Sequence, residues 1–432
     1  MIYWTYNTFL TLCLPVVVPY IVMKVRRRSG PGRGLGERLG FLGPKRPSEQ
    51  DHPVWFHAAS VGEVAMTLPL IHAVRERFPQ LRPIVSTMTE TGQEAAERAL
   101  GDRGIAFFLP LDYPWTVGRV LGTLTPRALF IAETEIWPNL LHQCYRRGIP
   151  VVLFNGRISD RSFESYRRFR FFFKEVLGGI SAFGMQTERD GERIVEIGAS
   201  RDRVVITGNL KFDRPVLRPT KGEFRMIRSS LGLQARQAVF IAGSTHGGEE
   251  EIILQVFRQL KRFEPSLVLI LAPRHLERLG EVIKTLEQGH FLWVRKSQMP
   301  TDGFSGEVIL LDTMGELARI YSIGTVIFVG KSLVPGGGQN ILEPAAFGKP
   351  VIFGPHMENF REIASVMKRE GAGIEIRSEK ELSEAAQRLL TDRSYYTRAS
   401  RAALRTIQNN QGAIQKTLQI FGRYLEGEAL SA

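Results

Sequence analysis

The chain has 432 residues, of which 43% are hydrophobic and 23% charged, and its formal net charge is +13. This balance excludes a disordered or low-complexity chain, and the length suits two domains of roughly 150–200 residues each. The basic excess predicts an anionic partner: nucleic acid, an acidic membrane surface or a phosphorylated substrate. Cys13 and Cys144 are the only cysteines and lie far apart in the sequence. We therefore expect neither a disulfide framework nor a cysteine-based zinc site, and we expect the protein to occupy a reducing compartment.

The chain begins with "MIYWTYNTFLTLCLPVVVPYIVMKVRRR", an apolar stretch followed by a basic run. A cleaved signal peptide carries its charges before the apolar region, so this order argues against one. We interpret residues 1–28 as an uncleaved membrane anchor with its basic flank, which would keep the rest of the chain in the cytoplasm. Pro15 and Pro19 interrupt the stretch, so a helix lying in the membrane interface and a buried core helix remain as alternatives to a spanning one.

Residues 29–52 are rich in glycine, proline and cations and are expected to form a linker beside the membrane. Short apolar runs then alternate with amphipathic stretches, which is typical of parallel strands covered by helices on both faces. The predicted strands of the first domain are 53–60, 83–88, 105–110, 128–134, 150–156, 180–186 and 203–210. Those of the second domain are 238–245, 267–273, 291–296, 307–313, 325–331 and 350–355.

We therefore predict two doubly wound, Rossmann-like α/β domains facing a cleft, at 53–212 and 226–405, joined by a hinge at 213–225. The final segment, 406–432, is helical in its periodicity and is a candidate for packing back on the N-terminal domain. Open α/β sheets bind ligands beyond the carboxyl ends of their strands, so functional residues are expected in the loops there.

Three such loops in the second domain carry residue types that bind nucleotides. The loop sequences "LAPRH", "DTMGELARIY" and "GGGQNILEP" contain Pro273 and Arg274, then Met314, Gly315 and Glu316, then Gly337, Asn340 and Glu343. Backbone N–H groups at a helix start bind anions, and an arginine can bind a phosphate through two hydrogen bonds. Each residue alone has a structural alternative: a surface ion pair for Arg274, and a capping box for Asn340 with Glu343.

The first domain offers carboxylates at its strand ends. In "FHAASVGEV", Glu63 begins a helix, where it is either a general base or simply an acid favoured by the helix dipole. "IAETEIWPNL" adds Glu133 and Glu135, and "GNLKFD" adds Lys211. The segment 161–177, "RSFESYRRFRFFFKEVL", mixes aromatic and basic residues; it is either a lipid or acceptor contact or an ordinary amphipathic helix.

Six motifs spread along the chain are "SVGE", "ETEIWPN", "TGNLKFD", "GSTHGGEEE", "APRH" and "GGQNILEPAAFGKPVIFGPHMENF". In their order and spacing they resemble the motifs of the 3-deoxy-D-manno-oct-2-ulosonic acid (Kdo) transferases, over essentially the whole chain. The resemblance implies a GT-B glycosyltransferase that moves Kdo from CMP-Kdo to a phosphorylated lipid A precursor, lipid IVA, in lipopolysaccharide core biosynthesis. It also implies a single N-terminal anchor in the inner membrane, with the catalytic domains on the cytoplasmic side and an anionic membrane surface as partner.

Carried over by position, the resemblance implies roles for individual residues. Glu63 matches the proton acceptor of the family. The residues implied to bind CMP are Pro273, Arg274, Met314, Gly315, Glu316, Asn340, Ile341, Leu342 and Glu343. Further candidates for acceptor or donor contacts are Glu133, Glu135, Lys211, Ser244, His246 and Gly337.

An acceptor hydroxyl needs a base, and one displacement would invert the anomeric centre. The sequence contains no Asp-x-Asp, HExxH or Cys/His cluster, so we expect no metal and no cofactor, and the leaving phosphate would be neutralised by helix N-termini and cations. Rival interpretations are another glycosyltransferase or a sugar-nucleotide epimerase on the same architecture. A basic, membrane-tethered nucleic-acid binder is a third, but no nucleic-acid-binding motif supports it.

Overall fold

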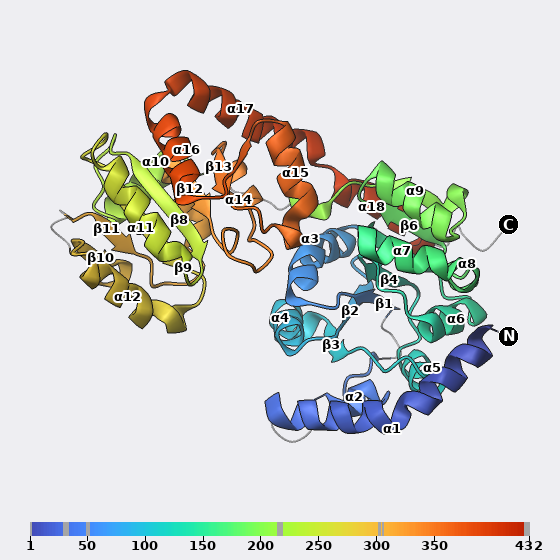
Figure 1. The fold of residues 1–432 in the computed structure, drawn as a ribbon. Coiled ribbons are helices and arrows are strands. Elements are labelled where there is room, and N and C mark those ends of the chain that lie inside the picture. Colours follow the sequence, from blue (N-terminus) through green and yellow to red (C-terminus); the bar gives the residue numbers. More distant parts are fainter. Residues whose placement is uncertain are drawn as a thin grey trace. The chain divides into compact units, whose positions relative to one another are not determined.

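The computed structural model describes residues 2–28, 34–48, 52–213, 219–300, 304 and 306–426. The chain forms two compact units: unit 1 is Met1–Arg214 together with Asn410–Ala432, and unit 2 is Pro215–Asn409. Each unit is built on a seven-stranded sheet in which neighbouring strands pair in parallel (Figure 1). The predicted fold class, α/β with two doubly wound sheets, is confirmed.

The sheet of unit 1 has the strand order β3-β2-β1-β4-β5-β6-β7, so the chain starts near the middle and winds outward in both directions. The strands are β1 (His52–His57), β2 (Leu81–Thr87), β3 (Ile105–Phe108), β4 (Leu129–Ala132), β5 (Val151–Gly156), β6 (Ala182–Met185) and β7 (Val204–Ile206). The helices are α1 (Ile2–Arg28), α2 (Leu35–Arg38), α3 (Val61–Arg77), α4 (Glu90–Leu100), α5 (Pro114–Leu124), α6 (Pro138–Arg146), α7 (Asp160–Arg168), α8 (Arg170–Leu177), α9 (Glu188–Ile197) and α18 (Ala413–Leu425). Short 3-10 turns lie at Gly101–Arg103, Arg201–Arg203 and Leu210–Asp213.

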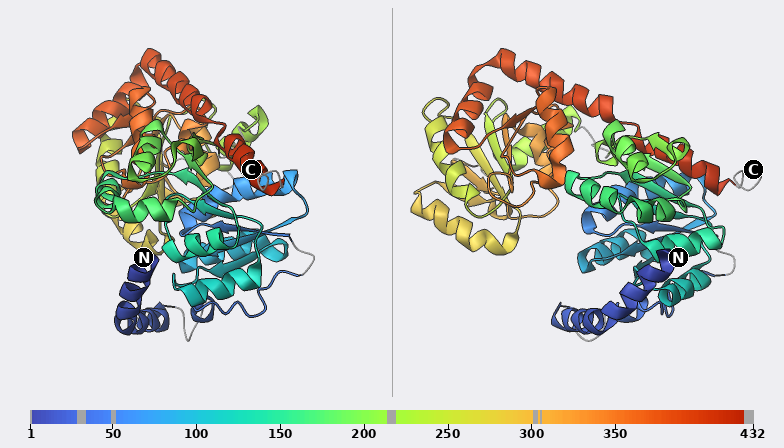
Figure 2. Two further views of the ribbon diagram at one scale, coloured as in Figure 1. Left: turned by 90° about the vertical axis from the view of Figure 1, so that its right-hand side faces the viewer. Right: turned by 45° about the vertical axis from the view of Figure 1, so that its right-hand side comes forward.

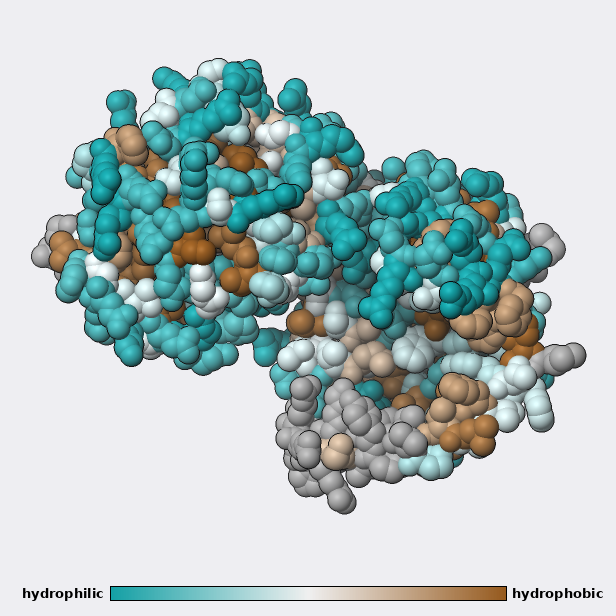
Figure 3. Space-filling model, viewed as in Figure 1, coloured by the Kyte–Doolittle hydropathy of each residue, from teal (hydrophilic) through white to brown (hydrophobic). Residues whose placement is uncertain are grey.

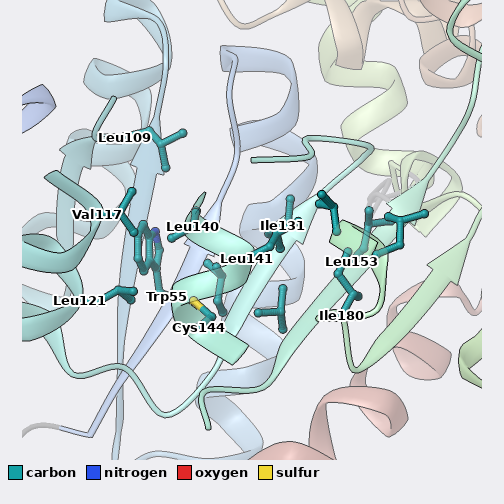
Figure 4. Close-up of a cluster of buried hydrophobic side chains, with 14 of the residues drawn as sticks. Trp55, Leu109, Val117, Leu121, Ile131, Leu140, Leu141, Cys144, Leu153 and Ile180 are labelled. Carbon is teal, nitrogen blue, oxygen red and sulfur yellow. The ribbon is translucent and has the colours of Figure 1, made fainter. Parts of the chain in front are cut away.

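One core of unit 1 lies between the sheet and helices α5, α6, α8 and α9 (Figure 4). Trp55 of β1 is fully buried there and donates its indole N–H to Ser86 Oγ at 2.8 Å. Its neighbours in this core include Val117, Leu121, Leu140, Leu141 and Cys144. Burial raises the pKa of the Cys144 thiol to about 12, so this cysteine is an unreactive core residue.

The other core of unit 1 is covered by α3 and α18. Phe421 of α18 is fully buried and stacks on Phe130 of β4, with ring centroids 3.5 Å apart. Asp213 holds the start of α18, because its carboxylate accepts hydrogen bonds from the backbone N–H groups of Gly412 at 2.7 Å and Ile414 at 2.5 Å. The end of the chain therefore completes unit 1.

The sheet of unit 2 has the order β10-β11-β9-β8-β12-β13-β14. Its strands are β8 (Val239–Thr245), β9 (Val268–Pro273), β10 (Trp293–Arg295), β11 (Val308–Leu310), β12 (Val326–Val329), β13 (Val351–Phe353) and β14 (Gly373–Glu375). Its helices are α10 (Lys221–Ser230), α11 (Glu249–Leu260), α12 (Leu279–Gln288), α13 (Leu317–Ile320), α14 (Leu342–Ala345), α15 (Arg361–Arg369), α16 (Glu379–Thr391) and α17 (Arg393–Asn410). Short 3-10 turns lie at Leu276–Arg278, Lys296–Gln298, Tyr321–Ile323 and Glu358–Phe360, and helices α11, α12 and α16 enclose a core on one face of the sheet.

Two segment boundaries differ from those expected. Residues 221–225 of the predicted hinge form the first turn of α10, because Thr220 and Glu223 make a reciprocal capping box that starts the helix; residues 214–218 lie outside the described part. The C-terminal segment expected at 406–432 is divided between α17 and α18, because Gly412, with φ 99°, breaks the helix.

The predicted linker at 29–52 is packed against unit 1 wherever it is described. Glu37 accepts a hydrogen bond from the backbone N–H of Phe108 at 2.7 Å, and Lys45 donates to the carbonyl oxygen of Ala106 at 2.8 Å. Both partners belong to β3, an edge strand whose outer backbone groups would otherwise be open to pairing with another strand. Residues 34–48 therefore cover an edge of the sheet rather than form a free tether.

The N-terminal segment forms the helix α1, which continues through Pro15 and Pro19. Among the helices of the described residues, none is both long enough and apolar enough to span a bilayer. The predicted spanning anchor is therefore not confirmed.

Candidate active site

Glu63 lies where the sheet of unit 1 changes its winding direction, at the carboxyl end of β1 beside β4. Ser60 caps α3 by accepting a hydrogen bond from the Glu63 backbone N–H at 3.4 Å. The Glu63 carboxylate in turn accepts hydrogen bonds from the Ala59 backbone N–H and from Ser60 Oγ, both at 2.9 Å. Glu63 therefore has the structural role considered for it, an acid at the start of a helix. It also lies at the edge where such sheets bind ligands.

The carboxyl group of Glu63 has an unusual electrostatic environment. Burial, followed by the charge of Glu133 and then more weakly that of Glu135, raises its pKa from 4.5 to about 7, against the opposing effect of its two hydrogen bonds. A carboxylate with a pKa near neutrality is well matched to accepting a proton from a hydroxyl group. Burial also raises the pKa of Glu135.

Glu133 follows β4 and connects Glu63 to two cations. Its carboxylate pairs with Arg157 Nε at 3.0 Å and with Lys211 Nζ at 3.9 Å. Its backbone has φ 56°, a left-handed conformation that is uncommon outside glycine and that clusters at functional sites. The structure therefore brings together the predicted residues Glu63, Glu133, Glu135 and Lys211 and adds Arg157, which the sequence analysis did not identify.

Three buried amide side chains, those of Asn155, Gln186 and Asn209, hold the loop that carries Lys211 through hydrogen bonds. Gln186 donates to the carbonyl oxygen of Asn155 at 2.9 Å, and Asn209 donates to Gln186 Oε1 at 2.8 Å. Asn209 Oδ1 accepts the backbone N–H of Lys211, and Asn155 Oδ1 that of Leu210, both at 3.0 Å. Asn155 is the last but one residue of β5, Gln186 directly follows β6, and Asn209 lies three residues after the end of β7.

In unit 2 the predicted nucleotide residues follow neighbouring strands of one sheet edge. Strands β11, β9, β8 and β12 are adjacent and parallel, so their carboxyl ends meet at that edge. The residues in or after these four ends are Ser244 and His246, Pro273 and Arg274, Met314 to Glu316, and Gly337 with Asn340 to Glu343. The edge also lies at the change in winding direction, between β8 and β12.

The polar side chains at this edge differ in whether they already form ion pairs or hydrogen bonds within the protein. Arg274 is exposed, and no carboxylate in the described ranges forms an ion pair with its guanidinium. Glu316 pairs with Lys296 Nζ at 2.6 Å. Asn340 Oδ1 accepts the backbone N–H of Leu342 and Asn340 Nδ2 donates to Glu343 Oε1, both at 3.1 Å.

The capping box considered as the structural alternative for Asn340 and Glu343 does not form, because Ile341 is the cap and α14 begins one residue later. Helix α14 and helix α13 each have four residues. Their dipoles are therefore small, and any anion here would be bound mainly by individual backbone N–H groups and side chains.

The backbone conformation and the neighbouring side chains require glycine at two positions before Asn340. Gly337 has φ 94°, and a Cβ there would lie 2.3 Å from Asn359 Nδ2. Gly338 has φ 75°, and its Cβ would lie 2.4 Å from Met357 Sδ. The glycines therefore provide a left-handed turn and also allow the close approach of Asn359 and Met357.

Glu249 is a buried carboxylate that the sequence analysis did not single out. It is fully buried and accepts backbone N–H groups from His246 at 2.9 Å, Lys331 at 2.7 Å, Ser332 at 2.9 Å and Leu333 at 3.0 Å. It thereby ties the loop after β8 to the loop after β12, which leads into the glycines. Its place in a run of three glutamates at a helix start was visible in the sequence, but its burial was not.

The mixed aromatic and basic segment 161–177 packs in part against unit 1 and in part stays exposed. Tyr166 and Phe173 pack against the core of unit 1, as an amphipathic helix requires. Phe169 and Phe171 are 52% and 69% exposed, so part of the segment remains available for contact with an apolar partner.

The sequence is similar to a family of known activity. A sequence profile described as "3-Deoxy-D-manno-octulosonic-acid transferase (kdotransferase)" matches residues 33–214. The 3-deoxy-D-manno-octulosonic acid transferase of Haemophilus influenzae is 36% identical over 424 residues, covering 98% of each chain. The protein of the same description from Bordetella pertussis is 31% identical, covering 96% of this chain and 98% of its own.

Solved structures extend the likeness to the fold. The UDP-GlcNAc 2-epimerase of Neisseria meningitidis aligns with a TM-score of 0.58 at 14% identity, covering 85% of this chain and 99% of that one. A glycosyltransferase from Rickettsia africae aligns with a TM-score of 0.58 at 12% identity, covering 87% and 99%. At these identities the likeness shows the fold alone, which is of the GT-B type.

Proposed function

We propose that this chain, which belongs to the 3-deoxy-D-manno-octulosonic acid (Kdo) transferase family, moves Kdo from CMP-Kdo to a hydroxyl group of a phosphorylated lipid A precursor, lipid IVA. Within the structure, the observation that carries the proposal is Glu63, whose carboxyl pKa is raised to about 7 at the ligand-binding edge of unit 1. The acceptor, the mechanism and the residue roles are the parts that experiment must test.

In this mechanism Glu63 accepts the proton of the acceptor hydroxyl as the oxygen attacks the anomeric carbon of Kdo. The new carbon–oxygen bond forms while the bond from that carbon to the CMP phosphate breaks, so one displacement inverts the centre. With a pKa of about 7, roughly half of the Glu63 side chains are ionised at neutral pH. General base catalysis of this kind contributes about 10²–10⁴ to the rate.

Arg157 and Lys211 are proposed to tune this base through Glu133. The negative charge of Glu133 raises the pKa of Glu63, and the two cations that pair with Glu133 offset part of that effect. We also propose that Glu133, Glu135 and Lys211 contact the acceptor or the donor. The cations would favour a negatively charged sugar next to an otherwise acidic cluster.

The donor nucleotide is proposed to bind the edge of unit 2 that carries Arg274. Negative charge develops on the departing CMP phosphate, and the exposed guanidinium together with loop N–H groups would stabilise it. Met314 to Glu316 and Asn340 to Glu343 would complete the nucleotide site. No metal ion has a part in this proposal.

The membrane is proposed as the location of the acceptor and of the protein, at the cytoplasmic face of the inner membrane. A net charge of +13 attracts an anionic leaflet and a phosphorylated glycolipid, by about 1 kcal/mol for each cation near the surface.

Incubating the full chain with CMP-Kdo and lipid IVA and weighing the lipid products tests the proposal directly. We expect the acceptor mass to rise by one or more Kdo units, and the variant Glu63→Gln to serve as the matched inactive control. Adding UDP-N-acetylglucosamine as a competing donor tests the rival enzymes. Transfer from the competitor, or an unchanged acceptor mass with CMP-Kdo, would contradict the proposal.

A further inference from the structure

The start of α6 is capped by an aspartate from another loop of unit 1. Trp137, the residue before the helix, makes no side-chain cap, and Pro138 at the first position has no N–H group. Asp112 accepts the next two backbone N–H groups, that of Asn139 at 3.0 Å through Oδ2 and that of Leu140 at 2.9 Å through Oδ1. Asp112 therefore does for α6 what the side chain of a capping residue usually does.

Helix α1 supplies two further hydrogen bonds to this cap. The Tyr6 hydroxyl donates to Asp112 Oδ2 at 3.0 Å, and Asn7 Oδ1 accepts a hydrogen bond from Asn139 Nδ2 at 2.7 Å. Asp112 and Asn139 are only 7% and 2% exposed, and Figure 3 shows apolar side chains gathered beside the N-terminal half of α1. The hydrogen bonds therefore lie beneath a largely apolar surface, where they are stronger than in water.

The same half of α1 has other contacts with unit 1, which serve as a comparison. Tyr3 stacks on His142 of α6, with ring centroids 3.9 Å apart, and Tyr113, just before α5, donates to the Leu10 carbonyl oxygen at 2.9 Å. In Figure 1 and in the right-hand view of Figure 2 this half of the helix lies beside α5 and α6. The hydroxyl of Tyr113 thus holds α1 without bonding to the cap of α6.

The capped helix start is also one end of the loop that carries Glu135. Only residues 133–137 separate the end of β4 from the start of α6. At the other end the backbone N–H of Glu133 donates to a carbonyl oxygen of β5 at 2.9 Å. Between Glu135 and the helix, Ile136 and Trp137 pack against the core of unit 1. A loop this short takes its shape from both of its ends, and Glu135 lies toward the end that α6 fixes.

We propose that Asp112 and Asn139 are positioning residues of the active site: they fix the start of α6 and thereby the carboxylate of Glu135, and Tyr6 and Asn7 of α1 complete this arrangement. The proposal rests on the proposed function for the part that Glu135 plays in transfer. The link from α1 to Glu135 stands on the contacts alone and is tested without substrate.

Glu135 itself reports whether its loop is held. Burial raises the pKa of its carboxyl group. If the start of α6 loosens, the loop admits water, and the pKa of Glu135 falls toward its ordinary value. A smaller folded fraction alone would not change the pKa measured in the folded molecules.

Titration of the full chain by NMR, with isotope-labelled glutamate carboxyl carbons, measures this pKa. The Glu135 signal is assigned by its absence from Glu135→Gln, and the signals of Glu63 and Glu133, which are charged groups of the same site, are followed in the same spectra. The double variant Y6F/N7A removes both contacts of α1 with the cap and keeps the aromatic ring. We expect it to lower the pKa of Glu135 by about half a pH unit or more.

Tyr113→Phe is the matched control, because it removes a hydroxyl that holds α1 elsewhere. It should leave the pKa of Glu135 unchanged. An unchanged pKa in Y6F/N7A would overturn the proposal. So would an equal decrease in Tyr113→Phe, because the docking of α1 as a whole, and not the cap, would then control the loop.

Hydrogen exchange provides a second measurement that does not depend on titration. Asp112→Asn keeps the shape of the side chain but leaves it one oxygen, so the amide hydrogens of Asn139 and Leu140 should exchange about tenfold faster or more. The amides of α12 in unit 2 should exchange as in the wild type. Unchanged exchange at Asn139 and Leu140 would overturn the proposal; if Asp112→Asn does not fold, the same two amides are compared in Y6F/N7A.

Transfer from CMP-Kdo then tests what the loop contributes to the reaction. We expect kcat/KM of Y6F/N7A to fall about three- to tenfold while CMP binding, measured by calorimetry, stays unchanged. Wild-type rates in a double variant whose Glu135 pKa has fallen would overturn the role in transfer. A wild-type chain that transfers no Kdo would contradict the proposed function instead, and the NMR and exchange results would still decide the link from α1 to Glu135.

Discussion

Replacing Glu63 by glutamine separates its chemistry from its place in the helix start. The glutamine side chain retains one oxygen, so it can accept one of the two hydrogen bonds from Ala59 and Ser60. Loss of the other costs about 1 kcal/mol of folding stability. The base is lost completely, because an amide does not accept a proton at neutral pH, so the transfer rate should fall by about 10²–10⁴.

The pH dependence of stability partly cancels that cost. Because the folded-state pKa of Glu63 is raised above its usual 4.5, its contribution to stability is fully present below pH 4.5 and is lost as the pH rises through about 7. Glutamine does not titrate. Relative to the wild type, the melting temperature of Glu63→Gln should therefore be lowest in acid and should recover above neutral pH.

Kinetics and calorimetry together test this reasoning. For the wild type, kcat/KM should rise with pH through an apparent pKa near 7 and then level off, as expected for a base that must be ionised. Glu133→Gln should move that rise to lower pH, because it removes the charge that contributes most to the shift after burial. Near-full turnover by Glu63→Gln with CMP-Kdo still bound would refute the assignment, and Glu133 and Glu135 would be tested next.

Three further predictions concern the nucleotide edge and the end of the chain. Activity should survive EDTA because the sequence has no recognised metal-binding motif; strict dependence that Mg²⁺ or Mn²⁺ restores would contradict this. Arg274→Ala should weaken CMP binding by calorimetry by roughly ten- to a hundredfold, and Gly337→Val should weaken it too while lowering the melting temperature, because the new side chain would meet Asn359; unchanged CMP affinity in both would return these residues to structural roles. Phe421→Ala should destabilise unit 1 by about 3–5 kcal/mol in urea unfolding, because it empties the space stacked on Phe130; an unchanged midpoint would show that α18 is dispensable.

The strands of both sheets could be predicted because parallel strands buried on two faces are continuous apolar runs. β14 was missed because it has three residues, none of them fully buried, at the edge of its sheet. The first turn of α10 was missed for a different reason. The spacing of Thr220 and Glu223 is a capping-box signal, but the prolines and charges before it are typical of a hinge between domains.

The site could be predicted in outline but not in its connections. Glu63, Glu133 and Lys211 follow strands, so their meeting at one edge could be expected from the fold class. Arg157 could not be chosen from the sequence, because a cation after a strand acquires meaning only when its partner is known to be Glu133. The same holds for Glu249, whose four backbone partners come from two loops that are far apart in the sequence.

The position of α18 has a consequence for the order in which the chain folds during synthesis. Asp213 and Gly412, at the helix start that it caps, are 199 residues apart in the sequence, and all of unit 2 lies between them. At about 5–20 residues per second, the ribosome needs about 10–40 s to make that stretch. Throughout this interval the strands of unit 1 have been synthesised, but the apolar face that Phe421 covers, including Phe130 and Phe154, is not yet covered by α18. Unit 2 can therefore finish folding before unit 1, although the synthesis of unit 1 begins first. The exposed apolar face of unit 1 has to avoid aggregation until α18 has been synthesised.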